Sequence, residues 1–266
     1  MAEVIQRHLE EMLLEFEQSK RIGLFNEQEI KKIIRTRKRH EYKIIRRTKE
    51  KECYLDYIKK LKLGITHKKN EIDLAIKRRI ERLFRSACHR FKKDIQLWLT
   101  FIEFLKKQYD YSTASSVYLS ALQIHSNKHW LWILAAKFEF EVMVSPSSAR
   151  ALFQRALRLM PKCKQLWIEY FKLELLYVEL IEKRRAVLDG NRKDKSDDEN
   201  SDAILEGKII EVVLNNAQES IPDDPEFLCS FASILYEFRQ FSFVEEIVNK
   251  IYRILEEKYS SDVLSQ

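Results

Sequence analysis

Side chains that could ligate a metal or attack a substrate are few and scattered in this sequence. His125 and His129 are four residues apart, but Ser126 and Asn127 between them favour a loop, and no carboxylate follows at a metal-ligand spacing. The four cysteines form no close pair, so neither a zinc site nor a disulfide framework is predicted. No nucleophile, metalloprotease, kinase or phosphate-loop motif occurs. We therefore predict no catalytic site, no metal, no cofactor and no small-molecule substrate.

Cationic side chains, in contrast, are concentrated where they could bind phosphate groups or an acidic surface. Residues 31–93 contain 24 Lys and Arg against 7 Asp and Glu, a net charge of +17, whereas residues 1–30 carry −4 and residues 94–266 carry −6. Such a block is typical of contact with RNA or an acidic protein, or of nuclear import; the alternative is a solvated helix face. The contact is predicted for Arg35, Arg37, Lys38, Arg39, Arg46, Arg47, Lys77, Arg78 and Arg79.

One modification site is suggested by a short acidic pattern. Ser196 is followed by Asp197, Asp198 and Glu199, which is typical of an acid-directed phosphoacceptor. It lies in a polar stretch, residues 183–206, that we predict to be a disordered insertion.

The elements that carry these residues are predicted to be helices. Only four Gly and four Pro occur in 266 residues, too few for the turns of a sheet protein of this size. Residues 3–20 have the apolar spacing of an amphipathic helix. Asn26 and Glu29 then form a capping box, from which one long helix carrying the basic block is predicted to run towards Gly64.

The following part of the chain is a repeat of 34 to 35 residues. Trp98, Trp132 and Trp167 share one repeat position, and an Ala stands eleven residues before each of them. Large rings on one helix need a small residue on the facing helix, so the pattern predicts stacked helical hairpins, an all-α solenoid. Because the tryptophans hold a fixed repeat position, we assign them to the core rather than to base stacking. The predicted repeat core comprises Phe84, Ala87, Trp98, Tyr118, Ala121, Trp132, Phe153, Ala156, Trp167 and Tyr170.

The repeats lack the Leu-Gly pair of tetratricopeptide repeats and instead resemble half-a-tetratricopeptide (HAT) repeats. Residues 149–156, Ala-Arg-Ala-Leu-Phe-Gln-Arg-Ala, reproduce the second-helix pattern of that family position by position. A weaker fourth copy is predicted around residues 213–234, with a further helix over 243–254. The expected organisation is an N-terminal helical region with the basic helix (1–75), HAT repeats (76–182), the insertion (183–206) and weaker repeats (207–266).

The opening of the chain adds a more specific resemblance. Residues 21–25, 29–34 and 41–48, together with 94–99 and 124–137, resemble the U-three small nucleolar RNA-associated protein six family. The resemblance implies a non-catalytic scaffold of ribosome biogenesis in the nucleolus, a component of the small-subunit processome needed for pre-rRNA processing toward 18S rRNA. Its implied partners are β-propeller (WD-repeat) proteins of the UTP-B subcomplex and the pre-ribosomal RNA and snoRNA particle, with no membrane.

Two alternatives keep the helical fold but change the function. One is a HAT scaffold of a splicing or mRNA 3′-end processing complex, and the other is a basic protein that binds RNA directly. Members of the resembled family are longer than this chain, which we therefore expect to be a fragment or a short isoform.

Overall fold

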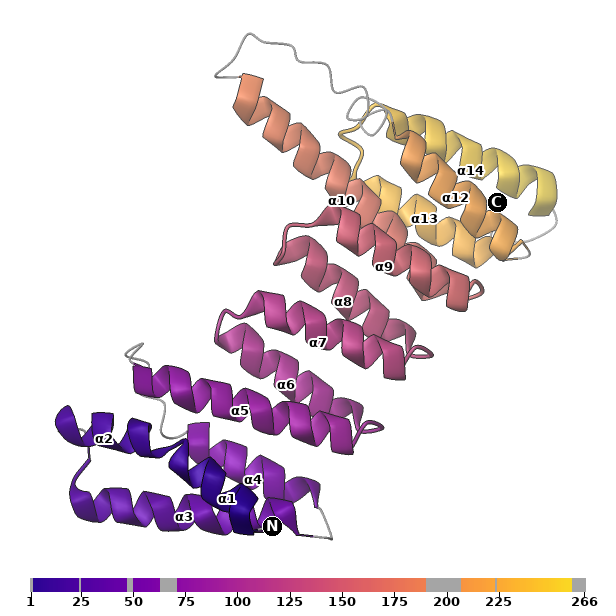
Figure 1. Ribbon diagram of the computed structural model, residues 1–266. Coiled ribbons are helices and arrows are strands. Elements are labelled where there is room, and N and C mark those ends of the chain that lie inside the picture. The colour runs from indigo at the N-terminus through magenta and orange to yellow at the C-terminus, as the bar shows by residue number, and fades with distance from the viewer. Residues whose placement is uncertain are drawn as a thin grey trace. The chain divides into compact units, whose positions relative to one another are not determined.

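The computed structural model describes residues 2–23, 25–46, 50–62, 71–189, 207–222 and 224–259. These residues form α-helices and no strand, which confirms the predicted all-α class (Figure 1). The chain divides into two compact units, Met1–Val117 and Tyr118–Gln266, which we call the N-terminal and C-terminal units. The division falls inside helix α7 (Tyr111–Ile124).

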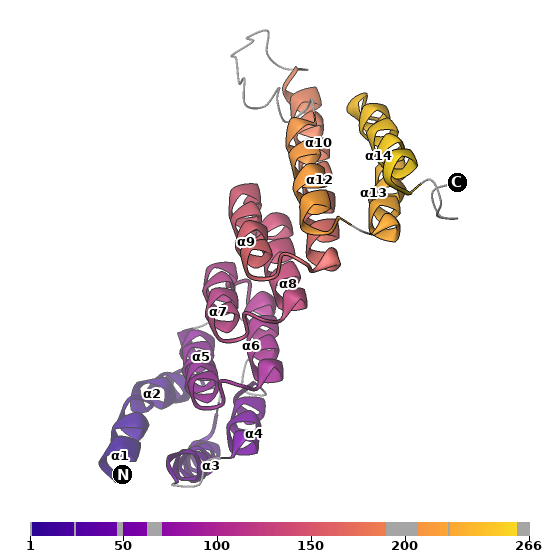
Figure 2. The same cartoon turned by 90° about the vertical axis from the view of Figure 1, so that its right-hand side faces the viewer.

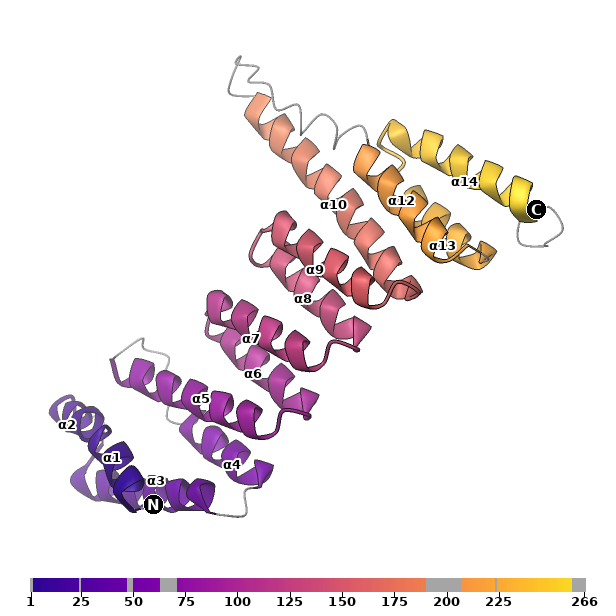
Figure 3. The ribbon, with the colours of Figure 1, turned by 45° about the vertical axis from the view of Figure 1, so that its right-hand side comes forward.

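The N-terminal unit is a stack of helices (Figure 3). Helix α3 contacts α4, α4 contacts α5, and α5 contacts α6, while α1 and α2 lie on α3 and α5 respectively. The helices are α1 (Ala2–Glu10), α2 (Leu13–Arg21), α3 (Glu27–Ile45), α4 (Lys51–Lys62), α5 (Glu71–Arg90) and α6 (Ile95–Lys107).

The two helices expected at the N-terminus are each divided. The first is interrupted at Glu11 and Met12, between α1 and α2. The second begins as predicted, with the Asn26 and Glu29 capping box in place, but α3 ends at Ile45 and Arg46 turns the chain with ψ of 156°. Our prediction of one continuous helix towards Gly64 was wrong, because folding α4 back onto α3 buries its apolar face, which a straight helix would leave in solvent.

The C-terminal unit also consists of packed helices (Figure 2). Helix α8 packs on α9 and α9 on α10, while α12 and α13 lie against α10 and α14 lies against α13. Its complete helices are α8 (His129–Glu141), α9 (Pro146–Leu159), α10 (Lys164–Asp189), α12 (Lys208–Ser220), α13 (Pro225–Glu237) and α14 (Phe243–Tyr259). Helix α10 includes residues 183–189, which we had placed in the insertion; residues 190–206, with Ser196, lie outside the described residues.

The repeat tryptophans have the same local structure in all three copies. The indole Nε1 of Trp98 donates to the carbonyl of Lys92 at 3.2 Å, that of Trp132 to Ser126 at 3.0 Å, and that of Trp167 to Pro161 at 2.8 Å. Each bond reaches back six residues, so the ring closes the turn that precedes its own helix. The indole N–H is thereby satisfied on burial, and the tryptophans act as core residues.

Ring contacts join the two helices of each hairpin. Phe84 stacks on Phe101 with centroids 4.9 Å apart, and Phe153 stacks on Tyr170 at 5.5 Å. In the second repeat the position of Phe101 and Tyr170 is occupied by Ala135. There the Tyr118 ring contacts the Phe138 ring instead, with centroids 5.2 Å apart. All ten residues of the predicted repeat core are buried.

Within the described residues, the acidic, histidine and cysteine side chains form no group that could hold a metal ion. The four cysteines are free thiols. No helix in the described ranges has both the length and the apolar character needed to cross a membrane.

Candidate functional site

The predicted basic block forms an exposed stripe along one side of α3. Arg35 and Arg39 are exposed and lie four residues apart, which places them on one face of α3, and the exposed Arg46 follows directly after the end of the helix. Lys38 is exposed beside them, and Tyr42, 46% exposed, lies on the same face. We call these five residues the α3 stripe. Cations interleaved with an exposed ring can contact both the phosphates and the bases of a single strand.

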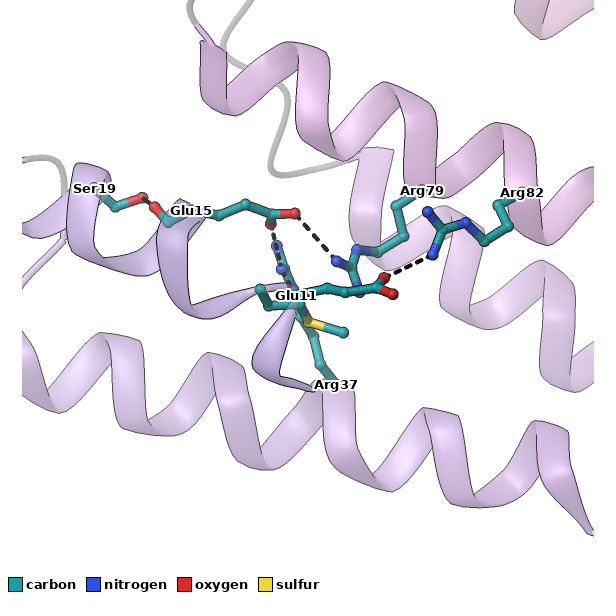
Figure 4. Close-up of polar contacts among 7 residues, drawn as sticks. Glu11, Glu15, Ser19, Arg37, Arg79 and Arg82 are labelled. Carbon is teal, nitrogen blue, oxygen red and sulfur yellow. Dashed lines mark hydrogen bonds and ion pairs between the residues drawn. The ribbon is translucent and has the colours of Figure 1, made fainter. Parts of the chain in front are cut away.

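Two of the predicted cations are not on the surface. The Nη1 of Arg37 donates to Glu15 Oε2 at 2.9 Å, and the Nη2 of Arg79 donates to Glu15 Oε1 at 3.1 Å (Figure 4). The three side chains are only 10 to 11% exposed. The prediction that Arg37 and Arg79 contact RNA or a partner is therefore corrected. Both side chains instead join α2 to its neighbouring helices inside the N-terminal unit.

Helical periodicity contains the signal that separates Arg37 from the α3 stripe. Arg37 lies seven residues from Ile30 and seven from Ile44, both buried, so it occupies the core face of α3. Arg79 likewise lies between the buried Ile76 and Leu83 of α5 at spacings of three and four. The density of charge hides this difference in position, because residues 35–39 form one basic cluster in the sequence unless their helical spacing is considered. Sequence reasoning also missed Tyr42.

The remaining predicted cations belong to other surfaces. Arg78 is exposed on α5 and lines a shallow hollow with Arg82 and Glu11, whereas Lys77 is half-buried. Arg82 Nη1 donates to Glu11 Oε2 at 2.9 Å, and this bond lowers the pKa of the Glu11 carboxyl. Arg47 lies outside the described residues.

A groove in the C-terminal unit offers a second, more apolar surface. It has a volume of about 660 Å³ between α9, α10 and α12. Trp167 and Tyr170 line it from α10, and Val212 of α12 is 56% exposed in its wall. The described residues that line it include the cations Arg158 and Lys208 but no carboxylate.

A partly buried ion pair holds two helices of this groove together. Arg150 of α9 binds Glu174 of α10 through two bonds, Nε to Oε1 at 2.7 Å and Nη2 to Oε2 at 2.5 Å. The guanidinium also lies over the Tyr177 ring, 4.6 Å from its centroid. Arg150 is the first of the two arginines of the HAT-like motif, so the motif builds the joint between α9 and α10.

Comparison with known proteins gives one consistent family. A family model described as U3 small nucleolar RNA-associated protein 6 matches residues 9–90. The human U3 small nucleolar RNA-associated protein 6 homolog is 38% identical over 277 residues, covering 100% of this chain and 46% of the human protein. The Schizosaccharomyces pombe U3 small nucleolar RNA-associated protein 6 is 32% identical over 245 residues, covering 88% of this chain and 50% of its own. The chain spans about half the length of these curated relatives.

Among solved structures, MamA from Desulfovibrio magneticus aligns with 79% of this chain and 97% of its own. The TM-score is 0.35 at 10% identity, too weak a likeness to support an argument about fold or function.

Proposed function

Because the chain belongs to the U3 small nucleolar RNA-associated protein 6 family, we propose that it is a non-catalytic scaffold of the U3 snoRNA particle that processes pre-rRNA toward 18S rRNA. The observation that carries this proposal is the 38% identity to the human relative across the full length of the chain. In this proposal the protein acts in the nucleolus, within the small-subunit processome.

We assign different tasks to its two surfaces. The α3 stripe contacts phosphates of the particle's RNA, because its cations are exposed to solvent. The groove between α9, α10 and α12 receives a segment of a partner protein, for which the WD-repeat proteins of UTP-B are our candidates. Charge complementarity with Arg158, which is exposed, favours an acidic segment.

Affinity purification tests the function. The tagged chain should co-purify U3 snoRNA and 18S precursors from cells of its source organism. A charge-reversed α3 variant should retain its fold and lose these RNAs; it combines Arg35→Glu, Lys38→Glu, Arg39→Glu and Arg46→Glu. The matched control reverses four exposed cations of the C-terminal unit: Lys128→Glu, Arg155→Glu, Lys162→Glu and Arg184→Glu.

Each result has a distinct meaning. Absence of U3 snoRNA from the wild-type purification would contradict the proposed function itself. Recovery of U3 snoRNA with the α3 variant at the wild-type level would leave that function standing and contradict only the role of the stripe.

A further inference from the structure

A pocket inside the N-terminal unit has no role in the function proposed above. It has a volume of about 280 Å³ and lies among α2, α3, α4 and α5. This is close to the lower end of pockets that enclose a small ligand, roughly 300 Å³, so it suits one large side chain. Its apolar lining comes from all four helices and the turn before α3: Phe16, Phe25, Ile33, Leu61, Ile72 and Ile76.

His40 supplies an unpaired polar group to this apolar lining. The residue is 4% exposed, and neither its Nδ1 nor its Nε2 has a hydrogen-bond partner. Its ring stacks on Tyr57, with centroids 5.1 Å apart and planes 6° from parallel. Burial, and then Lys60 and Lys43, lower the pKa of His40, so the neutral ring is favoured and one nitrogen is an acceptor.

The charged groups around the pocket are not equivalent. Arg37 and Glu15 line it but are occupied with each other. Lys32 and Lys60 also line it, and both side chains are exposed. They stand in the block that carries a net charge of +17. An occupant that brings carboxylates to this rim is therefore favoured over a cationic or purely apolar one.

We propose that this pocket binds one tyrosine or tryptophan side chain presented by an acidic segment of a partner protein. The ring fills the apolar space, its hydroxyl or indole N–H donates to the free nitrogen of His40, and the flanking carboxylates meet Lys32 and Lys60. Aromatic residues with a polar tip are the usual anchors of protein interfaces because one end is apolar and the other forms a hydrogen bond.

The observations favour a protein side chain over an RNA base. A base would need an open aromatic face on which to stack. The His40 and Tyr57 rings already cover each other, and the Arg37 guanidinium lies over the Phe16 ring at 5.0 Å from its centroid. The remaining apolar lining has one further ring, that of Phe25, and is otherwise aliphatic, from Ile33, Leu61, Ile72 and Ile76.

The test begins with a displayed library of random 12-residue peptides selected on the full-length chain. We expect enrichment of peptides with a tyrosine or tryptophan among acidic residues. Ile33→Trp, which fills the pocket, and Lys60→Glu, which reverses the rim, should each weaken binding at least tenfold. Lys59→Glu is the matched control, because Lys59 is an exposed neighbour on α4 that does not line the pocket.

His40→Phe gives the sharper readout, because phenylalanine keeps the stack on Tyr57 and removes both nitrogens. An enriched tyrosine peptide should bind the wild-type chain about tenfold more tightly than its phenylalanine version, the effect of one buried hydrogen bond. This preference should disappear in His40→Phe, with an unchanged or higher melting temperature.

Three outcomes would overturn the proposal. They are selection without an acidic aromatic pattern, binding that Lys60→Glu and His40→Phe leave intact, and displacement of the peptide by a single-stranded RNA 10-mer that cross-links to the pocket. The last would assign the pocket to a nucleobase. None depends on co-purification of U3 snoRNA, so failure here and failure of the proposed function are distinguishable.

Discussion

Glu15 joins three helices of the N-terminal unit through a single side chain. Its carboxylate accepts from Arg37 of α3 and Arg79 of α5, and its backbone carbonyl accepts from the Ser19 hydroxyl at 2.7 Å. Removing one member of a buried ion network strands the others without a partner in a poorly solvated site. Glu15 therefore contributes to stability through the two arginines that it neutralises.

Glu15→Leu should lower the free energy of unfolding by about 3–5 kcal/mol, since two buried guanidinium groups lose their counter-charge. Urea unfolding followed by circular dichroism measures this. Glu11→Leu is the control, because Glu11 and Arg82 form an exposed pair whose loss should cost under about 1 kcal/mol. Equal losses in the two variants would refute the buried network.

Gly207 has a role that its sequence context does not reveal. It adopts φ of +72° as the residue before α12, and a Cβ there would lie 2.6 Å from Phe243 Cδ2. Phe243 is buried, so its ring has little freedom to move away. Both the backbone conformation and the close approach require glycine at this position.

Gly207→Ala should be destabilising through strain and overpacking together. Gly23→Ala isolates the strain, because Gly23 has φ of +70° with nothing within 4 Å of a Cβ. The strain alone costs about 1–2 kcal/mol, and overpacking at Gly207 should add about 1–3 kcal/mol. Thermal unfolding of both variants gives the comparison; a smaller loss at Gly207 than at Gly23 would contradict it.

At the scale of the element, acidic N-caps combine two interactions at the starts of helices. Asp94 accepts from the backbone N–H groups of Gln96 and Leu97 and from Lys51 Nζ at 2.5 Å. Lys51 is the main cause of the lowered pKa of the Asp94 carboxyl. Asp224 caps α13 in the same way, and Lys164 lowers its pKa.

Asp94→Asn should keep the cap of α6 and lose the charge. The folded-state pKa of Asp94 lies below its unfolded value, so its stabilisation is present above about pH 3.9 and is lost as the pH falls through the folded pKa. The variant should thus be less stable at pH 7 and match the wild type near pH 2.

Unfolding titrations at the two pH values measure this difference. Asp94→Ala removes the cap as well. It should lower the free energy of unfolding by a further amount of about 0.5–2 kcal/mol at either pH. A constant gap between wild type and Asp94→Asn at both pH values would argue against the ion pair.

The extent to which the fold follows from the sequence differs between elements. Spacing alone located the repeat helices. Trp98, Trp132 and Trp167 each occupy the same buried position in their own repeat, and each needs a small residue on the facing helix. The break at Arg46 was not predictable in this way. The residues around it have no glycine or proline, and the helix ends there because α4 gains a packing surface on α3, a long-range effect.

The candidate site follows the same rule. The exposed cations of α3 were predicted from the local charge composition, which does not depend on which helix face a residue occupies. Arg37 was misplaced because composition cannot distinguish a cation with a buried partner, and that partner, Glu15, is 22 residues away in sequence. The pocket around His40 had no sequence signal, since its lining comes from four helices.

At the scale of the whole molecule, charge is divided between the two units. Residues 1–117 contain 29 Lys and Arg against 17 Asp and Glu, net +12, while residues 118–266 contain 19 against 24, net −5. Binding of a polyanion should therefore depend on the N-terminal unit. The C-terminal unit should repel it weakly, which leaves its groove to protein segments.

Salt dependence measures this division in the intact chain. The affinity for single-stranded RNA should fall as salt rises, and replacing Arg35, Lys38, Arg39 and Arg46 by Gln should reduce the slope of log K against log salt by about 3. Neutralising Lys128, Arg155, Lys162 and Arg184 should leave the slope unchanged. A slope that responds equally to both sets would indicate non-specific attraction rather than contact by the α3 stripe.

The indole bonds of the repeats have a consequence for how the chain tolerates mutation. The acceptors are carbonyls of Lys92, Ser126 and Pro161, three residues with nothing in common except a main chain. Each tryptophan donates to a backbone carbonyl rather than to a side chain. The residues of these turns can therefore be substituted by almost any type, proline included, without loss of the contact. Mutational tolerance should thus be high at the turns and low at the rings, and the turns are where new surface chemistry can be acquired without cost to the hairpins.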